Sequence, residues 1–105
     1  MKEHVILLKA LGDTTRLKLL KLIWDQERCV CELQPALGIS QPAVSQHIAK
    51  LKAAGLVKER RAGMWVYYQA DRSRLLEGLE AFKAFLDADL DGVPELAGIR
   101  VEGSC

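Results

Sequence analysis

The strongest structural signal in the sequence is a helix that begins near Ser40 and ends at Gly55, directly after a shorter helical run. Ser40 is a good N-cap, and Pro42 falls in the first turn, where its missing N–H costs no hydrogen bond. The buried stripe of this helix is predicted to be Val44, Ile48 and Leu51. The preceding run, residues 29–37, stops at Gly38, which suits the residue after a helix. Two helices joined by so short a turn predict a helix-turn-helix, whose second helix lies in the major groove of DNA.

A β-hairpin is expected directly after this helix. Residues 57–61 and 64–69 are strand-like, and the second run is rich in β-branched and aromatic side chains. The dipeptide Ala62-Gly63 joins the two runs as a tight turn. The aromatic cluster of Trp65, Tyr67 and Tyr68 is expected to pack rather than to stack on bases. A hairpin in this position is the wing of a winged helix-turn-helix.

The rest of the chain is predicted to be mostly helical. Apolar side chains recur at helical spacing over residues 2–11, 14–25 and 75–90. In the second of these runs Arg16 lies off the apolar stripe. The expected fold class is therefore mainly α with a β-hairpin wing, a winged helix-turn-helix of five helices and one hairpin, over residues 1–91. Gly and Pro beyond that point predict a flexible C-terminal tail, residues 92–105.

The polar face of the helix after the turn supplies the predicted DNA contacts. Gln pairs with adenine, Ser bonds several base edges, and Lys meets phosphates. The candidates on this helix are Ser40, Gln41, Ser45, Gln46, His47 and Lys50. The cations of the hairpin, Lys58, Arg60 and Arg61, fall where a wing lies against phosphates or the minor groove. His47 is at the edge of the apolar stripe, so a packed imidazole and a phosphate contact both fit its position.

Size and charge limit the class of molecule and its partners. A chain of 105 residues with 50% hydrophobic and 28% charged side chains predicts one globular domain, small enough to gain from sharing a core with a second copy. The net charge of +1 says little about DNA binding, because the distribution of charge decides it. No apolar run approaches the roughly 20 residues that cross a bilayer, and no leader is recognised. We therefore expect a cytoplasmic protein with no membrane partner.

The cysteines are Cys29, Cys31 and Cys105, and their odd number predicts ligation or thiol chemistry rather than a disulfide framework. On a regular helix, side chains two apart diverge by roughly 200°. Cys29 and Cys31 therefore share a ligand only where the start of their helix is unwound, and Pro35 weakens that helix. Because this helix supports the one that contacts DNA, a ligand on the thiols is expected to misplace the DNA-contacting face. Thiolates select soft ions, which favours arsenite, antimonite or a soft metal.

Five runs of the sequence, in this order, resemble the ArsR/SmtB family of metal- and metalloid-sensing repressors. They are LGDTTRL at 11–17, CVCEL at 29–33, SQPAVSQHI at 40–48, LKAAGLV at 51–57 and RAGMWVYY at 61–68. The resemblance implies a homodimer held by the first and last helices, operator DNA bound without ligand, and release on binding a toxic ion. It implies a repressor and not an enzyme, so no catalytic cofactor is expected.

The CVCEL run resembles the arsenic-responsive version of this helix, which implies arsenite or antimonite as effector and a role in arsenic resistance. The His and Asp pattern of the zinc sensors is missing from the last helix. A third cysteine expected shortly after the pair is replaced, the nearby positions being Gln34 and Pro35. The third ligand is therefore Cys105 of the same or the partner subunit, a small thiol, or water. Three alternatives stay open: a cadmium, lead or zinc sensor, a thiol redox-sensing repressor, and a winged helix used for protein contact alone.

Overall fold

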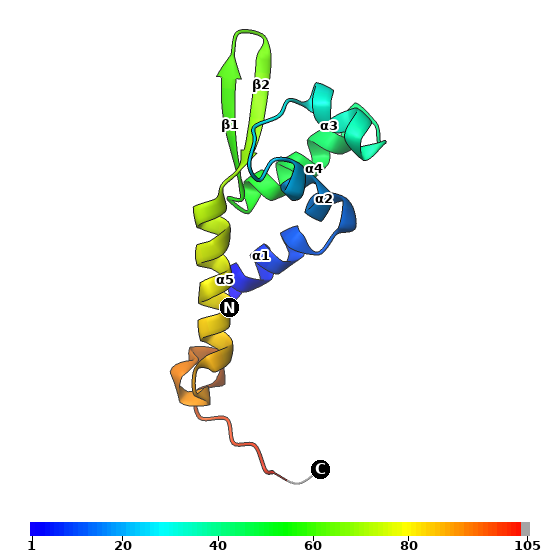
Figure 1. Cartoon of the computed structure of the whole chain (residues 1–105). Coiled ribbons are helices and arrows are strands. Elements are labelled where there is room, and N and C mark those ends of the chain that lie inside the picture. The colour runs from blue at the N-terminus through cyan, green and yellow to red at the C-terminus, as the bar shows by residue number, and fades with distance from the viewer. Residues whose placement is uncertain (104–105) are drawn as a thin grey trace.

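The computed structural model describes residues 1–103, so Cys105, one of the predicted ligands, lies outside the described residues. Within that range the chain forms five α-helices, one two-stranded sheet and two short 3-10 helices (Figure 1). In chain order they are α1 (Lys2–Leu11), α2 (Thr14–Leu22), α3 (Val30–Leu37), α4 (Gln41–Ala53), β1 (Val57–Ala62), β2 (Trp65–Ala70), α5 (Arg72–Asp87), η1 (Leu90–Gly92) and η2 (Pro94–Leu96). This order confirms the predicted fold class.

Local capping fixes the ends of the helices that carry the site. The side chain of Asp13 accepts a hydrogen bond from the Arg16 backbone N–H at 3.0 Å, and Ser40 accepts one from the Ala43 N–H at 3.2 Å. Gly38 ends α3 with a φ of 66°, a left-handed conformation in which a Cβ atom is unfavourable. The turn of the helix-turn-helix is thus held by a glycine on one side and a serine cap on the other.

The core lies where α2, α3 and α4 pack against one another. Its fully buried side chains are Leu19, Ile23, Leu33, Val44, Leu51 and Leu56. The predicted inner stripe of α4 is confirmed, because Val44, Ile48 and Leu51 are all buried. Burying one such side chain contributes about 1.5–3 kcal/mol, so this packing holds α4 firmly against α3.

The hairpin of β1 and β2 extends away from the helical body (Figure 1). The strands pair antiparallel, from Val57 opposite Ala70 to Ala62 opposite Trp65. The loop before α3 also pairs with this hairpin, because the backbone of Arg28 forms an isolated bridge with that of Tyr68. The wing is therefore attached to the segment that leads into α3.

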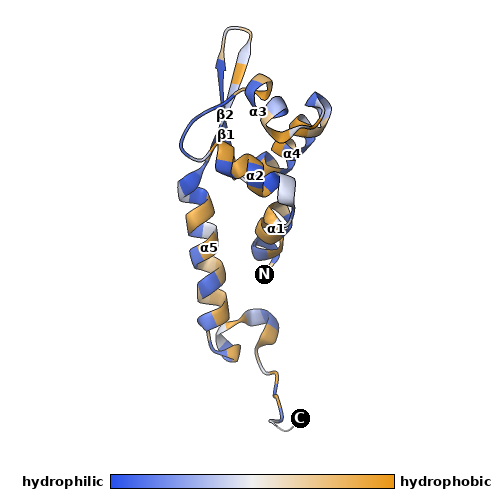
Figure 2. Ribbon diagram, turned by 45° about the vertical axis from the view of Figure 1, so that its right-hand side comes forward, coloured by the Kyte–Doolittle hydropathy of each residue, from blue (hydrophilic) through white to orange (hydrophobic). Residues whose placement is uncertain are grey.

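α5 forms a stem that runs away from the helix-turn-helix and gives the molecule an elongated shape of 58 × 26 × 19 Å (Figure 1). α1 packs beside it, and hydrophobic residues recur along both helices (Figure 2). Several of these side chains are 39–63% exposed, namely Val5, Ile6, Leu8, Leu76, Leu79 and Leu86. These exposed apolar side chains lie on two helices that pack against each other.

Some boundaries differ from the sequence prediction. α2 ends at Leu22 rather than near residue 25, because the Ile23 carbonyl oxygen accepts a hydrogen bond from the Ala70 N–H at 2.9 Å. α5 begins at Arg72, where Asp71 supplies a side-chain cap, and it ends at Asp87 rather than at residue 90.

The expected flexible tail begins with ordered turns. η1 and η2 occupy residues 90–96, and Val93 between them is buried, with 6% of its surface exposed. The first part of this segment therefore has regular turns and one buried apolar side chain. Over the part of the chain that the structure describes, we find no helix with the length and hydropathy of a membrane span.

Candidate DNA-binding surface and thiol site

The predicted DNA-contacting side chains of α4 lie on its exposed face, Gln41, Ser45 and Gln46 for bases and Lys50 for phosphate. Gln41 and Ser45 are four residues apart, as are Gln46 and Lys50, so each pair shares one side of the helix. All four side chains are exposed. Ser40 lies just before them, and its hydroxyl already caps the helix. The face therefore offers amide and hydroxyl groups for base edges and a cation for phosphate.

His47 lies at the edge of this face and contacts a buried arginine. Its Nδ1 is 3.3 Å from Nη1 of Arg16. A guanidinium only donates hydrogen bonds, so Nδ1 is the acceptor in this contact. Arg16 is 8% exposed, and its Nε and Nη2 donate to the carbonyl oxygens of Ala10 and Lys9 at 2.6 and 3.1 Å. Arg16 thus joins the end of α1 to α4. This role is not predicted by the sequence, where Arg16 lies off the apolar stripe.

Arg60, one of the three predicted wing cations, is paired within the protein. Its Nε donates to Oε2 of Glu27 at 3.0 Å, its Nη2 donates to Oε1, and its guanidinium lies 4.8 Å from the centre of the Tyr67 ring. This hydrogen bond holds the pKa of the Glu27 carboxyl below its ordinary value. Arg60 therefore ties β1 to the loop before α3, and its charge is partly compensated.

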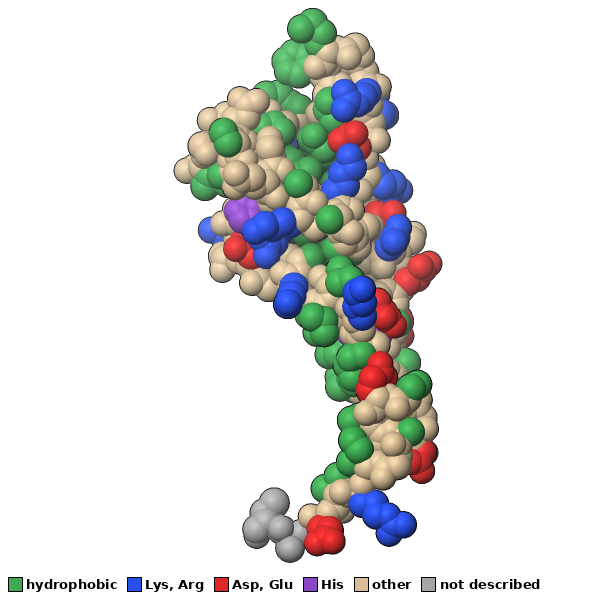
Figure 3. All heavy atoms as spheres, turned by 180° about the vertical axis from the view of Figure 1, so that it is seen from behind, with side chains coloured by type: hydrophobic (Ala, Val, Ile, Leu, Met, Phe, Trp, Pro, Cys, Tyr) green, Lys and Arg blue, Asp and Glu red, His purple; other side chains and the backbone are tan. Residues whose placement is uncertain are grey.

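The other two wing cations are more available to an outside partner. Lys58 is exposed, and the nearest carboxylate oxygen to Arg61 belongs to Glu59, 3.9 Å from its Nε. The side chain of Arg61 is 76% exposed. Lys and Arg side chains are spread over the hairpin and the body below it (Figure 3). Asp and Glu side chains lie among them in the same view.

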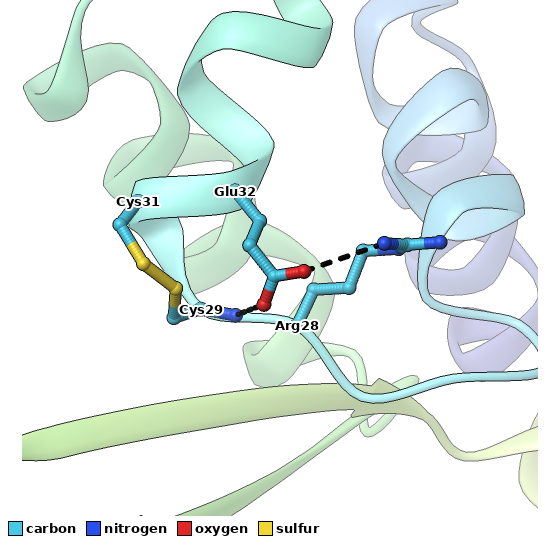
Figure 4. The surroundings of a disulfide bond; sticks show 4 residues. All are labelled: Arg28, Cys29, Cys31 and Glu32. Carbon is cyan, nitrogen blue, oxygen red and sulfur yellow. Dashed lines mark hydrogen bonds and ion pairs between the residues drawn. A yellow bond between two sulfur atoms is a disulfide. The ribbon is translucent and has the colours of Figure 1, made fainter.

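The thiol pair lies at the start of α3. Cys29 is the N-cap, with an extended backbone of φ −87° and ψ 166°, and Cys31 is in the first turn. Because Cys29 is outside the helix, its sulfur reaches that of Cys31, and the two are joined in a disulfide (Figure 4). The sequence predicts ligation or thiol chemistry at this pair, and here the two thiols are oxidised. The bond spans one residue and joins no separate elements, so it is a local crosslink and not a disulfide framework.

Arg28 and Glu32 hold the thiol pair in place (Figure 4). Oε1 of Glu32 accepts a hydrogen bond from the Cys29 N–H at 3.3 Å, and Oε2 lies 3.4 Å from Nη1 of Arg28. Nε of Arg28 donates to the Leu22 carbonyl oxygen at 2.7 Å, at the end of α2. Through its backbone bridge to Tyr68, Arg28 also reaches β2. The residue before the thiol pair therefore connects it to α2 and to the wing.

A cavity of about 420 Å³ opens beside the thiol pair. Its walls include the two thiol positions, two base-contacting candidates and two wing aromatics, that is Cys29, Cys31, Gln41, Ser45, Trp65 and Tyr68. The predicted ligand site, the wing and α4, which is the predicted recognition helix, therefore meet at this cavity.

The described residues supply two thiols here, and beside them the Glu32 carboxylate accepts a hydrogen bond from the Cys29 N–H. Within residues 1–103, no three His, Cys, Asp or Glu side chains are grouped so that they can hold a metal ion. The predicted third ligand, Cys105, lies outside that range. Two sulfur atoms suit a soft ion or a metalloid.

Residues 13–59 match the model of the bacterial regulatory protein, arsR family. The ArsR2 protein of Halobacterium salinarum is 44% identical over 84 residues, which are 76% of this chain and 71% of that protein. This chain belongs to the ArsR family. The family consists of DNA-binding transcription regulators and not of enzymes.

Other relatives of this ArsR-family chain differ in what their names describe. The arsenic resistance transcriptional regulator ArsR1 of Pseudomonas putida is 49% identical over 65 residues, 61% of this chain and 51% of that protein. The chain therefore spans about half the length of that relative. Nodulation protein NolR of Rhizobium meliloti is 34% identical over 93 residues, 89% of this chain and 76% of that protein. Family membership alone therefore does not name an effector.

Solved structures confirm the winged helix-turn-helix of this ArsR-family chain. An ArsR-like transcriptional regulator from Rhodococcus sp. RHA1 superposes with a TM-score of 0.72 at 27% identity, over 91% of this chain and 93% of that one. The winged helix-turn-helix DNA-binding domain Mb0332 from Mycobacterium bovis, whose structure is described as homodimeric, gives a TM-score of 0.67 at 27% identity over 88% and 85%.

Reasoning from the sequence missed several residues that organise this site. The role of Glu32 could have been predicted, because a Glu three residues after an N-cap is the pattern of a capping box. The pairing of Glu27 could not, since its partner Arg60 is 33 residues away in the chain. The sequence marks Arg28 only as the neighbour of a thiol, and its bridge to Tyr68 depends on how the loop folds back.

Proposed function

We propose that this chain is a repressor that binds operator DNA as a homodimer and leaves it when arsenite or antimonite binds the thiols of Cys29 and Cys31. The observation that carries the proposal is the position of the thiol pair. It lines the same cavity as Gln41 and Ser45, two of the predicted base contacts. The names of relatives such as the arsenical resistance operon repressor of Escherichia coli support the choice of effector.

The chemistry of the effector suits this pair once it is reduced. An external thiol reduces the disulfide and is itself oxidised to a disulfide. Two As–O bonds of arsenite are then exchanged for As–S bonds, and each thiol proton leaves with a hydroxide as water. Cys31 is exposed and Cys29 is buried, so the ion meets Cys31 first and then draws on Cys29. Cys105, a small thiol or water completes the coordination.

The contacts around the pair offer two routes to the DNA-binding surface. A shift of Cys29 moves the start of α3, which packs against α4 and therefore changes the position of the recognition helix. The same shift strains the bridge between Arg28 and Tyr68, and Glu27 in the same loop holds Arg60 of the wing. The proposed release thus acts on α4 and on the wing together.

A homodimer accounts for the exposed apolar face of α1 and α5. Leu76 is 53% exposed and Leu86 is 63% exposed, although both lie on the longest helix of the chain. Covering these side chains with a second copy gains roughly 25 cal/mol for each square ångström of apolar surface. The homodimeric description of the similar Mb0332 domain supports the same arrangement. Two copies place two recognition helices on one duplex, as helix-turn-helix dimers require.

The proposal is tested by fluorescence anisotropy on labelled DNA from the region upstream of the gene, with the protein kept reduced by a phosphine. Arsenite is expected to release wild-type protein, and the Cys105→Ser variant reports whether the C-terminal thiol contributes to release. Cys29→Ser and Cys31→Ser are expected to bind DNA and to resist release. Undiminished release of both variants contradicts the proposal, and release by cadmium, lead or zinc but not by arsenite moves the assignment to a soft-metal sensor.

The disulfide between Cys29 and Cys31 favours a second candidate, a thiol redox-sensing repressor. In that case hydrogen peroxide takes two electrons from the thiols and forms water and the disulfide, which alters the start of α3. The same DNA assay separates the two functions. Release by peroxide that is reversed by a phosphine, together with no response of the reduced protein to arsenite, favours the redox sensor.

A further inference from the structure

We infer that the thiol pair and the adjoining cavity form a binding site for aryl arsenicals, R–As(OH)₂, in which both sulfurs bind arsenic and the aromatic ring occupies the cavity. The inference rests on the proposed function and narrows its effector class. It combines the number of sulfur ligands, the size and walls of the cavity, and the exposure of two hairpin side chains.

The number of thiols matches an arsenical that already carries one carbon substituent. Trivalent arsenic forms three bonds, and in R–As(OH)₂ one of them is to carbon. Cys29 and Cys31 replace the two hydroxyl groups, which gives R–As(S–Cys)₂ and two molecules of water without oxidation or reduction. Arsenic thus has all three of its bonds once it has bound the two thiols. Within residues 1–103, no third His, Cys, Asp or Glu side chain joins the pair in a metal-binding group.

The cavity beside the pair is large enough for an aromatic ring. Its volume of about 420 Å³ falls within the range of roughly 300–1,000 Å³ that is usual for small-molecule sites. Two aromatic side chains, Trp65 and Tyr68, line it together with Val66. Aromatic pairs attract one another beyond the effect of burial alone, so a ring is a well-matched occupant.

Two hairpin side chains at this cavity are largely exposed. Trp65, which the sequence predicts to pack, is 56% exposed, and Met64 is 97% exposed. Figure 3 shows hydrophobic side chains at the tip of the hairpin, away from the core. An aromatic ring held at the thiols covers part of this surface, which inorganic arsenite is too small to reach.

The position of the ring makes its effect on DNA binding direct. Gln41 and Ser45 also line the cavity, so the ring lies beside two predicted base contacts. A ring in this place displaces these side chains or fills the space between α4 and the wing. We therefore expect phenylarsonous acid to release DNA at lower concentration than arsenite does.

Calorimetry on the reduced protein tests the site without DNA, with phenylarsonous and methylarsonous acids as probes. Wild type is expected to bind the phenyl compound about tenfold more tightly than the methyl compound, the scale of an aromatic contact. Trp65→Ala is expected to lose this preference. Tyr67→Ala removes an aromatic side chain of the same strand that does not line the cavity, and it is expected to keep the preference.

A second measurement, made on the wild type, tests the inference even if the Trp65→Ala variant misfolds. In wild type, nuclear Overhauser contacts between the phenyl protons and the indole of Trp65 are expected, and their absence overturns the inference. An unchanged preference in Trp65→Ala also overturns it. If arsenite releases DNA but the phenyl compound shows no preference, the inference fails and the proposed function stands. If the phenyl compound binds in the cavity but neither arsenical releases DNA, the proposed function fails and the site stands.

Discussion

The backbone N–H of Arg28 donates to the Tyr68 carbonyl oxygen at 2.9 Å, and the Tyr68 N–H donates to the Arg28 carbonyl oxygen at 2.8 Å. Arg28 directly precedes the thiol pair, and Tyr68 belongs to the wing. The proposed input and one part of the proposed output are therefore joined through adjacent peptide units. Coupling of this kind needs no path through the core.

Hydrogen exchange of the Arg28 and Tyr68 amides is expected to accelerate when arsenite binds the reduced protein, because a ligand that moves Cys29 strains this bridge. The Ala70 amide is the matched control. Its N–H donates to the Ile23 carbonyl oxygen at 2.9 Å, and Ala70 is the last residue of β2, the strand that contains Tyr68. Nuclear magnetic resonance measures all three amides in one experiment. Unchanged protection of Arg28 and Tyr68, in a protein that releases DNA, excludes this route.

The wing cations are expected to contribute unequally to DNA binding. Arg61→Ala should lower the slope of the salt dependence of binding by about one unit for each phosphate that the variant no longer neutralises. Arg60→Ala should lower it less, because Arg60 already pairs with Glu27 and lies over Tyr67. Lys83→Ala on α5 is the control, since its ammonium pairs with Asp87 on the stem. Anisotropy at several salt concentrations gives the slopes, and a larger effect of Arg60 than of Arg61 contradicts this account.

Arg16→Met is expected to lower the free energy of unfolding by about 2 kcal/mol, because the carbonyl groups of Lys9 and Ala10 lose their buried donor. It should also weaken DNA binding, since His47 loses its hydrogen bond with the buried guanidinium. Lys18→Met, an exposed position on the same helix, is the matched control. Urea denaturation and anisotropy test the two effects. Equal stability of the two variants counts against a structural role for Arg16.

Leu76→Glu and Leu79→Glu are expected to make the protein monomeric and to weaken operator binding strongly, because each places a charge in the proposed apolar interface. Val101→Glu changes an apolar side chain that is 75% exposed beyond α5, and it should leave the assembly unchanged. Sedimentation velocity distinguishes the species. If the two leucine variants keep the sedimentation of the wild type, the face of α1 and α5 is not the dimer contact.

The secondary structure followed from local signals in the sequence. The cap at Ser40, the left-handed Gly38 and the inner stripe of α4 are each set by residues within a few positions of one another. The hairpin followed for the same reason. The end of α2 did not, because it depends on a hydrogen bond from Ala70 to Ile23 that only the folded chain brings together.

The candidate site was predicted in its chemistry but not in its connections. Periodicity already required the start of α3 to depart from a helix if Cys29 and Cys31 were to meet, and the extended Cys29 does so. The pairing of Arg60 with Glu27 and the burial of Arg16 come from tertiary packing. A charged residue gives no local sign of whether a distant segment will neutralise or cover it.

X-ray absorption of arsenite-loaded protein tests the central claim, that Cys29 and Cys31 hold the effector, most directly. Reduced wild type is expected to show arsenic with sulfur neighbours, and the Cys29→Ser/Cys31→Ser double variant is expected to show none. Cys105→Ser reports whether the C-terminal thiol supplies a further neighbour. An arsenic site with the same sulfur neighbours in the double variant as in the wild type contradicts the claim.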